Sequence, residues 1–209
     1  KEKLLKARKS WSAMAWQSKG PISLPGDFDG DMDVLVWSGN FMHGKYGSDL
    51  PCVRAAGIVN MSAKDLTDLL ADSTRVKEYN KICCGRSDLL ILQEDMQKDG
   101  PFGKSITKVM QSESRPPMLR KTLQFTSILH AKELDDGSGF LLVSRAVTRP
   151  DGVSLIDGSI LRSEILMGVN IIRKIQGAED SRCLMINVNH IRSPMVPMII
   201  AKKIGLSAA

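Results

Sequence analysis

Residues 123–148, LQFTSILHAKELDDGSGFLLVSRAVT, contain the pattern that decides the fold. Two runs rich in β-branched and other apolar residues flank Asp135-Asp136-Gly137, a sequence typical of a tight turn. The two runs extend over 119–134 and 140–148, and polar residues interrupt the apolar ones in both. The pattern therefore predicts two antiparallel strands joined by a hairpin turn.

The same pattern continues on both sides of this hairpin. Turn signals at 99–100, 115–117, 150–152 and 176–177 divide the sequence into further strand-like runs. The additional predicted strands are 33–38, 52–60, 89–93, 105–112, 160–175 and 182–191. Because the connections are short, neighbouring strands are expected to run antiparallel, as one long meander from residue 89 onward.

Helical patterns precede and follow the meander. Apolar spacings of three and four predict an amphipathic helix over 1–18, and Ser62 with Asp65 marks the start of a second helix. A short helix is predicted over 74–83, and a last helix over 195–206, with Pro197 in its first turn. We predict an α+β helix-grip fold, a long curved antiparallel sheet wrapped around the C-terminal helix, as a single domain over 1–209 that encloses an apolar cavity.

Composition narrows the class of partner. The net charge is +6 and the pI about 9.2, which favours anionic surfaces such as a phospholipid membrane. Aromatic residues make up only 5% and no basic run interleaves with them, so nucleic acid is not an expected partner. No apolar run reaches the roughly 20 residues that span a bilayer, no secretory signal is visible, and four cysteines fit a reduced thiol set. We expect a cytoplasmic monomer that associates peripherally with membranes.

Three local patterns resemble a known family in their order and spacing. They are Arg75-Val76-Lys77-Glu78-Tyr79-Asn80, Ile160-Leu161-Arg162-Ser163-Glu164 and the segment 187–197, which ends in Met195-Val196-Pro197. Over nearly the whole chain the sequence resembles the START domain, the lipid-transfer domain related to the steroidogenic acute regulatory protein. The resemblance implies a lipid held in a closed cavity, exchange at membranes, and neither an enzymatic step nor a cofactor.

The sequence also departs from the family pattern. Tyr79 and Asn80 stand where the family has tryptophan and aspartate. Val109 and Leu129 stand where sterol-transfer members carry a buried acid and an arginine. The usual anchor for a sterol hydroxyl is thus missing, and the resemblance leaves a phospholipid, a sterol or another apolar molecule open as the ligand.

Period-two alternation provides the candidate cavity residues, because Leu123, Phe125, Ser127 and Leu129 fall on one face of their strand. The corresponding positions of the neighbouring strands, polar head-group contacts and lid-helix residues complete the set. The predicted cavity residues are Thr107, Val109, Gln111, Leu123, Phe125, Ser127, Leu129, Arg145, Arg162, Leu184, Ile186, Val188, Met195, Met198 and Ile199. The alternative is that the apolar positions pack as a filled core and that Arg145 and Arg162 form ion pairs.

The loop 114–121 is a candidate gate. It places apolar residues between basic ones, a pattern suited to insertion of the apolar side chains into a membrane while the cations meet phosphate. Its candidate residues are Arg115, Met118, Leu119, Arg120 and Lys121. An ordinary proline turn with solvated charges is the alternative interpretation.

Catalytic and metal chemistry have little support in the sequence. The histidines His43, His130 and His190 are far apart and none has a partner at ligand spacing, so no metal site is predicted. No glycine-rich phosphate loop or nucleophile elbow is present. The main rival function is an enzyme of the same helix-grip superfamily, similar to a cyclase or hydrolase, acting on an apolar substrate in the cavity. A scaffolding domain with a filled core is a further rival.

Overall fold

The computed structural model describes residues 34–41, 48–117, 119–147, 155–157 and 159–193. The helices predicted over 1–18 and 195–206 lie outside these residues. The described elements are β1 (Leu35–Phe41), β2 (Ser48–Val59), α2 (Ala63–Ala71), α3 (Val76–Tyr79), β3 (Cys83–Gln93), β4 (Ile106–Ser114), β5 (Thr122–Glu133), β6 (Gly139–Ala146), β7 (Leu155–Asp157), β8 (Ile160–Lys174) and β9 (Cys183–Arg192).

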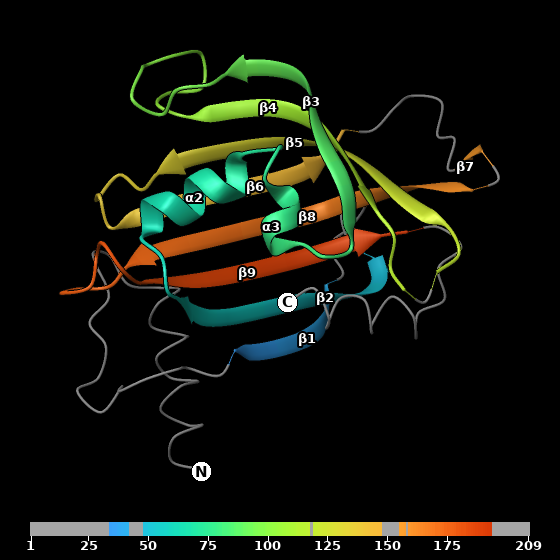
Figure 1. The fold of residues 1–209 in the computed structure, drawn as a ribbon, viewed down its shortest axis with the longest axis horizontal. Coiled ribbons are helices and arrows are strands. Elements are labelled where there is room, and N and C mark those ends of the chain that lie inside the picture. Colours follow the sequence, from blue (N-terminus) through green and yellow to red (C-terminus); the bar gives the residue numbers. More distant parts are fainter. Residues whose placement is uncertain (1–33, 42–47, 118, 148–154, 158, 194–209) are drawn as a thin grey trace, which may run out of the picture.

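These strands form one curved sheet in the order β1-β2-β9-β8-β6-β5-β4-β3, with the short β7 paired to β8. Neighbouring strands are antiparallel, except that the start of β5 also pairs in parallel with the start of β8. Figure 1 shows α2 and α3 in front of one face of the sheet, with the edge strand β3 curving past them. The antiparallel curved sheet predicted from the sequence is therefore confirmed.

The hairpin that decides the fold is present. β5 and β6 pair antiparallel up to Glu133 opposite Phe140, and Gly137 in the turn has a φ of 67°, which favours glycine. Two predicted boundaries are corrected. The helix expected over 74–83 is only one turn long, Val76–Tyr79, and Asn80 is its C-cap. The strand expected over 89–93 begins earlier, at Cys83.

Helix α2 fixes one face of the sheet. Its predicted N-cap is present, since the Ser62 Oγ accepts a hydrogen bond from the Asp65 N–H at 3.0 Å, an interaction typically worth about 1 kcal/mol. Leu66 and Leu69 of α2 pack in one buried cluster with residues of β4, β5, β6 and β8, including Met110, Leu129, Leu142 and Ile172. We call the side of the sheet that carries α2 the helix face, and the other side the outer face.

The outer face is also apolar over β1, β2, β9 and β8. Leu184 and Ile186 of β9 are fully buried there, in a cluster with Ala56 and with Trp37, Ile58 and Ile171. The Arg54 guanidinium lies 4.8 Å from the Trp37 ring centroid on the same side. Strand β9 therefore makes apolar contacts on both of its faces.

His130 on the outer face gives a pH prediction. Burial, with a contribution from the Lys132 ammonium, lowers the pKa of His130 below 6.5, and its Nδ1 lies 2.9 Å from the Thr107 Oγ1. The unfolded chain then binds a proton at His130 more readily than the folded protein does. The free energy of unfolding is therefore not reduced by this group above pH 6.5, and it decreases as the pH falls below 6.5. We expect His130→Gln to flatten the loss of unfolding free energy between about pH 7 and 5, measured by urea titration. An unchanged slope in the variant would contradict this assignment.

Candidate functional site

A cavity of about 530 Å³ lies between the helix face of the sheet and the segment that carries α2 and α3. Its walls are mainly apolar, and they come from strands that are far apart in the sequence. They include Ala55 of β2, Leu70 of α2, Met110 of β4, Leu129 of β5, Leu142 of β6 and Met185 of β9. This volume lies within the roughly 300–1,000 Å³ typical of pockets that enclose one small molecule.

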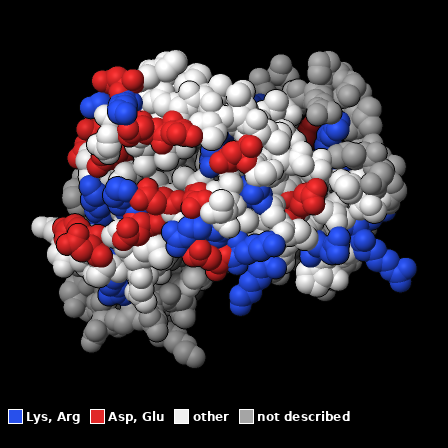
Figure 2. Space-filling model, turned by 45° about the horizontal axis from the view of Figure 1, so that its top comes forward, with Lys and Arg blue, Asp and Glu red and all other residues white. Residues whose placement is uncertain are grey.

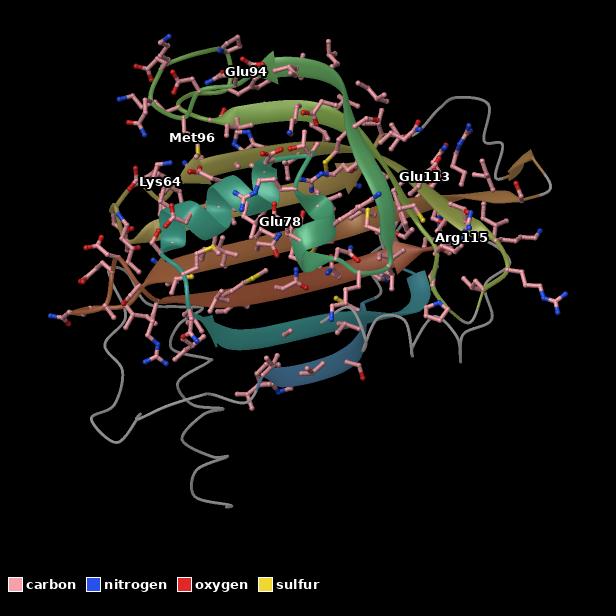
Figure 3. The ribbon with its side chains drawn as sticks, in the orientation of Figure 1. Lys64, Glu78, Glu94, Met96, Glu113 and Arg115 are labelled. Carbon is pink, nitrogen blue, oxygen red and sulfur yellow. The ribbon has the colours of Figure 1, made fainter. Side chains whose placement is uncertain are left out.

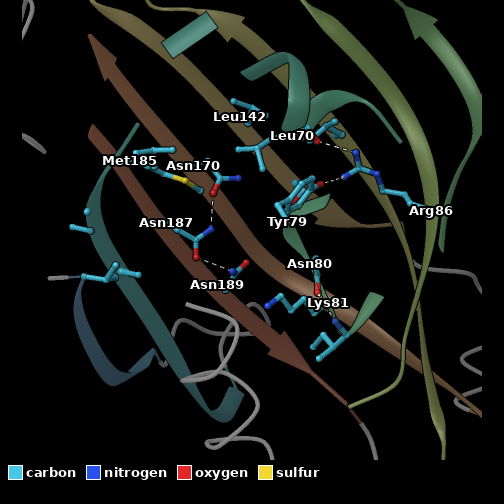
Figure 4. A pocket seen from close by; sticks show the side chains of 18 of the residues that line it. Leu70, Tyr79, Asn80, Lys81, Arg86, Leu142, Asn170, Met185, Asn187 and Asn189 are labelled. Atoms are coloured by element: carbon cyan, nitrogen blue, oxygen red, sulfur yellow. Dashed lines mark hydrogen bonds between the residues drawn. The ribbon is translucent and has the colours of Figure 1, made fainter. Parts of the chain in front are cut away.

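The floor of the cavity is polar, in contrast with its walls. Asn170 of β8 and Asn187 of β9 are directly opposite each other, and the Asn187 Nδ2 donates to the Asn170 Oδ1 at 2.5 Å. The Asn189 Nδ2 in turn donates to the Asn187 Oδ1 at 2.8 Å (Figure 4). Ser144 of β6 also lines the cavity. We call Asn170, Asn187 and Asn189 the asparagine ladder.

Arg86 of β3 holds one side of the cavity in place. Its guanidinium donates to the Tyr79 hydroxyl at 3.0 Å, to the Leu70 carbonyl at 2.9 Å and to the Asp72 carbonyl at 2.6 Å. Its Nε also donates to the Ser73 Oγ at 3.1 Å. Arg86 thereby ties the segment between α2 and α3 to the edge strand (Figure 4). Burial raises the pKa of Tyr79, so its hydroxyl stays neutral at physiological pH.

The predicted phase holds for β5 and is reversed for β4 and β9. Leu129 lines the cavity, and Ser127 and Phe125 share its face. On β4 it is Met110 that lies opposite Ser127, so Thr107, Val109 and Gln111 are on the outer face. On β9 the cavity residues are Met185, Asn187 and Asn189, while Leu184, Ile186 and Val188 face outward.

Other predicted cavity residues lie elsewhere in the structure. Leu123 and Phe125 pack with Leu161 in a separate apolar cluster. Arg145 lies opposite Ile128 and Arg162 opposite Gln124, which places both arginines on the outer face because their strand neighbours Ser144 and Leu161 are on the helix face. They cannot contact a ligand in this cavity. Met195, Met198 and Ile199 lie outside the described residues.

The predicted gate loop lies beyond the end of β4, and Figure 3 places Arg115 at the opposite end of the sheet from Lys64 of α2. Arg115 and Arg120 are exposed, and Lys121 is half-buried. Leu119 packs against the cluster of Leu123, Phe125 and Leu161, so it does not point outward as a membrane anchor would. Met118 lies outside the described residues.

Surface charge on the described residues is mixed. On the side shown in Figure 2, acidic and basic side chains are mixed toward the left, and basic side chains predominate along the lower right. Among the described residues, no helix is long and apolar enough to cross a membrane, and no cluster of histidine, cysteine and carboxylate side chains could hold a metal. All four cysteines are free thiols, and burial raises the pKa of Cys183 to about 12.

Sequence reasoning missed the asparagine ladder and Arg86. A usable signal was present for the ladder, because Asn187 and Asn189 alternate with the apolar Ile186 and Val188 in the last strand. Polar residues at period two in a strand of otherwise buried character indicate a face that meets a polar partner. For Arg86 the sequence contains no comparable pattern.

Comparison with known proteins finds solved structures that share this fold. No family model and no curated protein matches the sequence. The lipid transfer and protein localization domain of human StarD13 (DLC2) matches with a TM-score of 0.61 and 14% identity, over 97% of this chain and 90% of that one. Human StAR-related lipid transfer protein 5 matches with a TM-score of 0.64 and 11% identity, over 84% and 76%. A STAR-related lipid transfer protein from Xanthomonas axonopodis matches with a TM-score of 0.52 and 15% identity, over 84% and 90%.

These likenesses define the class of structure. The curved antiparallel sheet with helices on one face and a cavity between them is the START-domain fold, of the helix-grip type. The fold was predicted from the sequence, and the structural comparisons confirm it. The predicted cavity was to be closed by the helix over 195–206, which lies outside the described residues. At 11–15% identity the comparisons establish the fold alone.

Proposed function

We propose that this chain binds one lipid in the cavity on its helix face and carries it between membranes. The observation that carries the proposal is a cavity that combines apolar walls with a polar floor, on a fold shared with lipid-transfer domains. Apolar walls suit an acyl chain or ring system, and a few placed polar groups suit one head group.

The energetics of transfer support a carrier. Removing an acyl chain of about sixteen carbons from water is worth roughly 12 kcal/mol, at about 0.8 kcal/mol per methylene. Leu129, Leu142 and Met185 provide apolar contacts for such a chain. Hydrogen bonds at the floor need then only select and orient the ligand, because burial of its apolar part supplies the affinity.

Exchange requires the cavity to open at a membrane. We propose that the segment containing Met195, Met198 and Ile199 acts as the lid, and that Arg115, Met118, Arg120 and Lys121 approach the phospholipid head groups. Arg115 and Arg120 are exposed, as this role requires. In this proposal the chain acts as one domain, as a monomer, and visits cytoplasmic membrane surfaces peripherally.

The composition of the cavity favours a carrier over an enzyme. Among its described lining residues there is no carboxylate, histidine or cysteine, the groups that most often act as general acids, bases or nucleophiles. The titratable groups in the described lining are Tyr79, Lys81 and Arg86, and the pKa of Tyr79 is raised. A protonated phenol is a poor base near neutral pH.

The proposal can be tested on the protein as purified from cells. Native mass spectrometry should show a one-to-one adduct with a lipid, and extraction into organic solvent should release it. After incubation with mixed liposomes, the same measurement should show uptake of lipid and, in the presence of acceptor vesicles, its delivery. A protein that carries no lipid and takes up neither liposomal lipid nor a fluorescent acyl probe would overturn the proposal.

A further inference from the structure

We propose that the asparagine ladder selects a lipid whose head group is uncharged and both donates and accepts hydrogen bonds, such as a hydroxyl or an amide. This inference rests on the proposed binding of lipid in the cavity. The ladder lies on the helix face at the centre of the sheet, where β8 and β9 pair, and all three asparagines line the cavity.

The ladder has two chemically different ends. Asn189 donates to Asn187 and Asn187 donates to Asn170, so within the described residues the Asn170 amide nitrogen and the Asn189 amide oxygen have no protein partner. Turning over all three amides exchanges the two ends, but one end still donates and the other still accepts. A head group that can only accept would leave the accepting end unsatisfied.

Ser144 adds a further polar group to the floor. It lies opposite Gly168, which lies opposite Asn189, so these three residues form one row across β6, β8 and β9. A side chain at position 168 would collide with it, because an added Cβ would be 2.3 Å from the Ser144 Oγ. The glycine therefore leaves room for the Ser144 hydroxyl, a group that can both donate and accept.

The charged side chains of the described cavity lining are both cations, and neither belongs to the asparagine ladder. Among the described lining residues only Lys81 and Arg86 are charged, and Lys81 is exposed. The Arg86 guanidinium already makes four hydrogen bonds to Ser73, Tyr79, Leu70 and Asp72. Lys108, a buried cation on the helix face, is paired with Asp88 at 2.8 Å. The ladder itself is uncharged, so an anion placed on it would lose hydration and would depend on Lys81 or Arg86 for a counter-ion.

The size of the cavity limits the apolar part of the ligand. A volume of about 530 Å³ suits a single acyl chain or a ring system better than the two chains of a phospholipid. The ligand class we infer is thus a single-chain or ring lipid with a neutral hydroxyl or amide, oriented with its head group on the ladder.

A panel of sixteen-carbon probes that differ only in the head group tests this inference. Hexadecanol and hexadecanamide should displace a fluorescent reporter from the parent protein about tenfold better than hexadecyl phosphate at neutral pH, the effect of one net hydrogen bond. Asn187→Leu, which breaks the ladder at its centre and keeps the number and branching of the side-chain heavy atoms, should remove this preference. Asn189→Leu at the end of the ladder serves as a second variant if Asn187→Leu does not fold.

Two results would overturn the inference. In the first, hexadecyl phosphate binds with the same affinity as hexadecanol. If Lys81→Met then lowers the affinity for hexadecyl phosphate, the head-group site lies at the rim of the cavity. The other is an unchanged preference in folded Asn187→Leu and Asn189→Leu variants. Diphenylhexatriene, which has no head group, reports on the cavity itself. If it is not taken up, it is the proposed lipid binding that fails.

Discussion

Ala55→Trp is expected to weaken lipid binding about a hundredfold while the protein stays folded. Ala55 is 4% exposed, lies on the helix face of β2 opposite Asn187, and forms part of the cavity wall. An indole at this position would occupy the space above the ladder. If it displaces about four methylenes of a bound chain, the loss is about 3 kcal/mol, or roughly a hundredfold in affinity. Titration with a fluorescent acyl probe measures this loss.

Matched variants separate blocking of the cavity from damage to the fold. Ala55→Ser alters the same position without filling it and should bind the probe like the parent. Val147→Trp adds the same indole at a site that is 44% exposed, beyond the end of β6, and should also leave uptake unchanged. Urea unfolding checks that Ala55→Trp keeps the parent stability. A folded Ala55→Trp protein with undiminished uptake would exclude this cavity as the binding site.

The meander from β3 to β9 could be predicted from the sequence because turns and period-two runs are local signals, whereas the pairing of β2 with β9 could not. Asp135-Asp136-Gly137 specifies a hairpin whatever the chain does elsewhere, and β5 and β6 formed as predicted. On β5 the phase was also clear, because Thr126 and His130 alternate with residues that are buried. Leu129, which was in the predicted set, lines the cavity of the structure.

The phase predicted for β9 differs from the structure, because buried apolar residues lie on both faces and the polar Asn187 and Asn189 on one of them were given no weight. Leu184 and Ile186 are fully buried on the outer face, and Met185 lines the cavity on the other. A period-two pattern states that residues alternate but does not state which set faces inward. Choosing the more hydrophobic set put Leu184, Ile186 and Val188 into the predicted cavity, whereas Met185, Asn187 and Asn189 line the cavity of the structure.

Hydrophobicity also failed to indicate burial at the sheet edge. Residues 89–92 form an uninterrupted apolar run, yet all four side chains are 40–54% exposed. The reason lies in the topology, because β3 is the last strand of the sheet and its pairing with β4 is interrupted by irregularities at Asp88/Leu90 and Ile91/Gln93. Such tertiary placement has no local signature in the sequence.

Arg86 is expected to contribute more to stability than any other arginine of the α2–α3 region. The last carbonyls of a helix lack partners within the helix, and α2 has no basic residue in its own last turn. From β3, Arg86 provides both the missing hydrogen-bond donors and the missing positive charge, because its guanidinium donates to the Leu70 and Asp72 carbonyls. Arg86→Met should therefore lower the free energy of unfolding by about 3 kcal/mol, because charge-assisted hydrogen bonds are lost and carbonyls are left unsatisfied.

Arg75 provides the matched control for this prediction. It pairs with Glu78 three residues on, at 2.8 Å, but both side chains are exposed, and such pairs contribute little. Arg75→Met should unfold at the same urea concentration as the parent, whereas Arg86→Met should unfold earlier. Since Arg86 also holds the segment that closes one side of the cavity, Arg86→Met should speed the release of bound lipid and the hydrogen exchange of amides in 70–82. Equal stability of the two variants would show that the α2–α3 segment is held by its apolar contacts, with Arg86 contributing only at the surface.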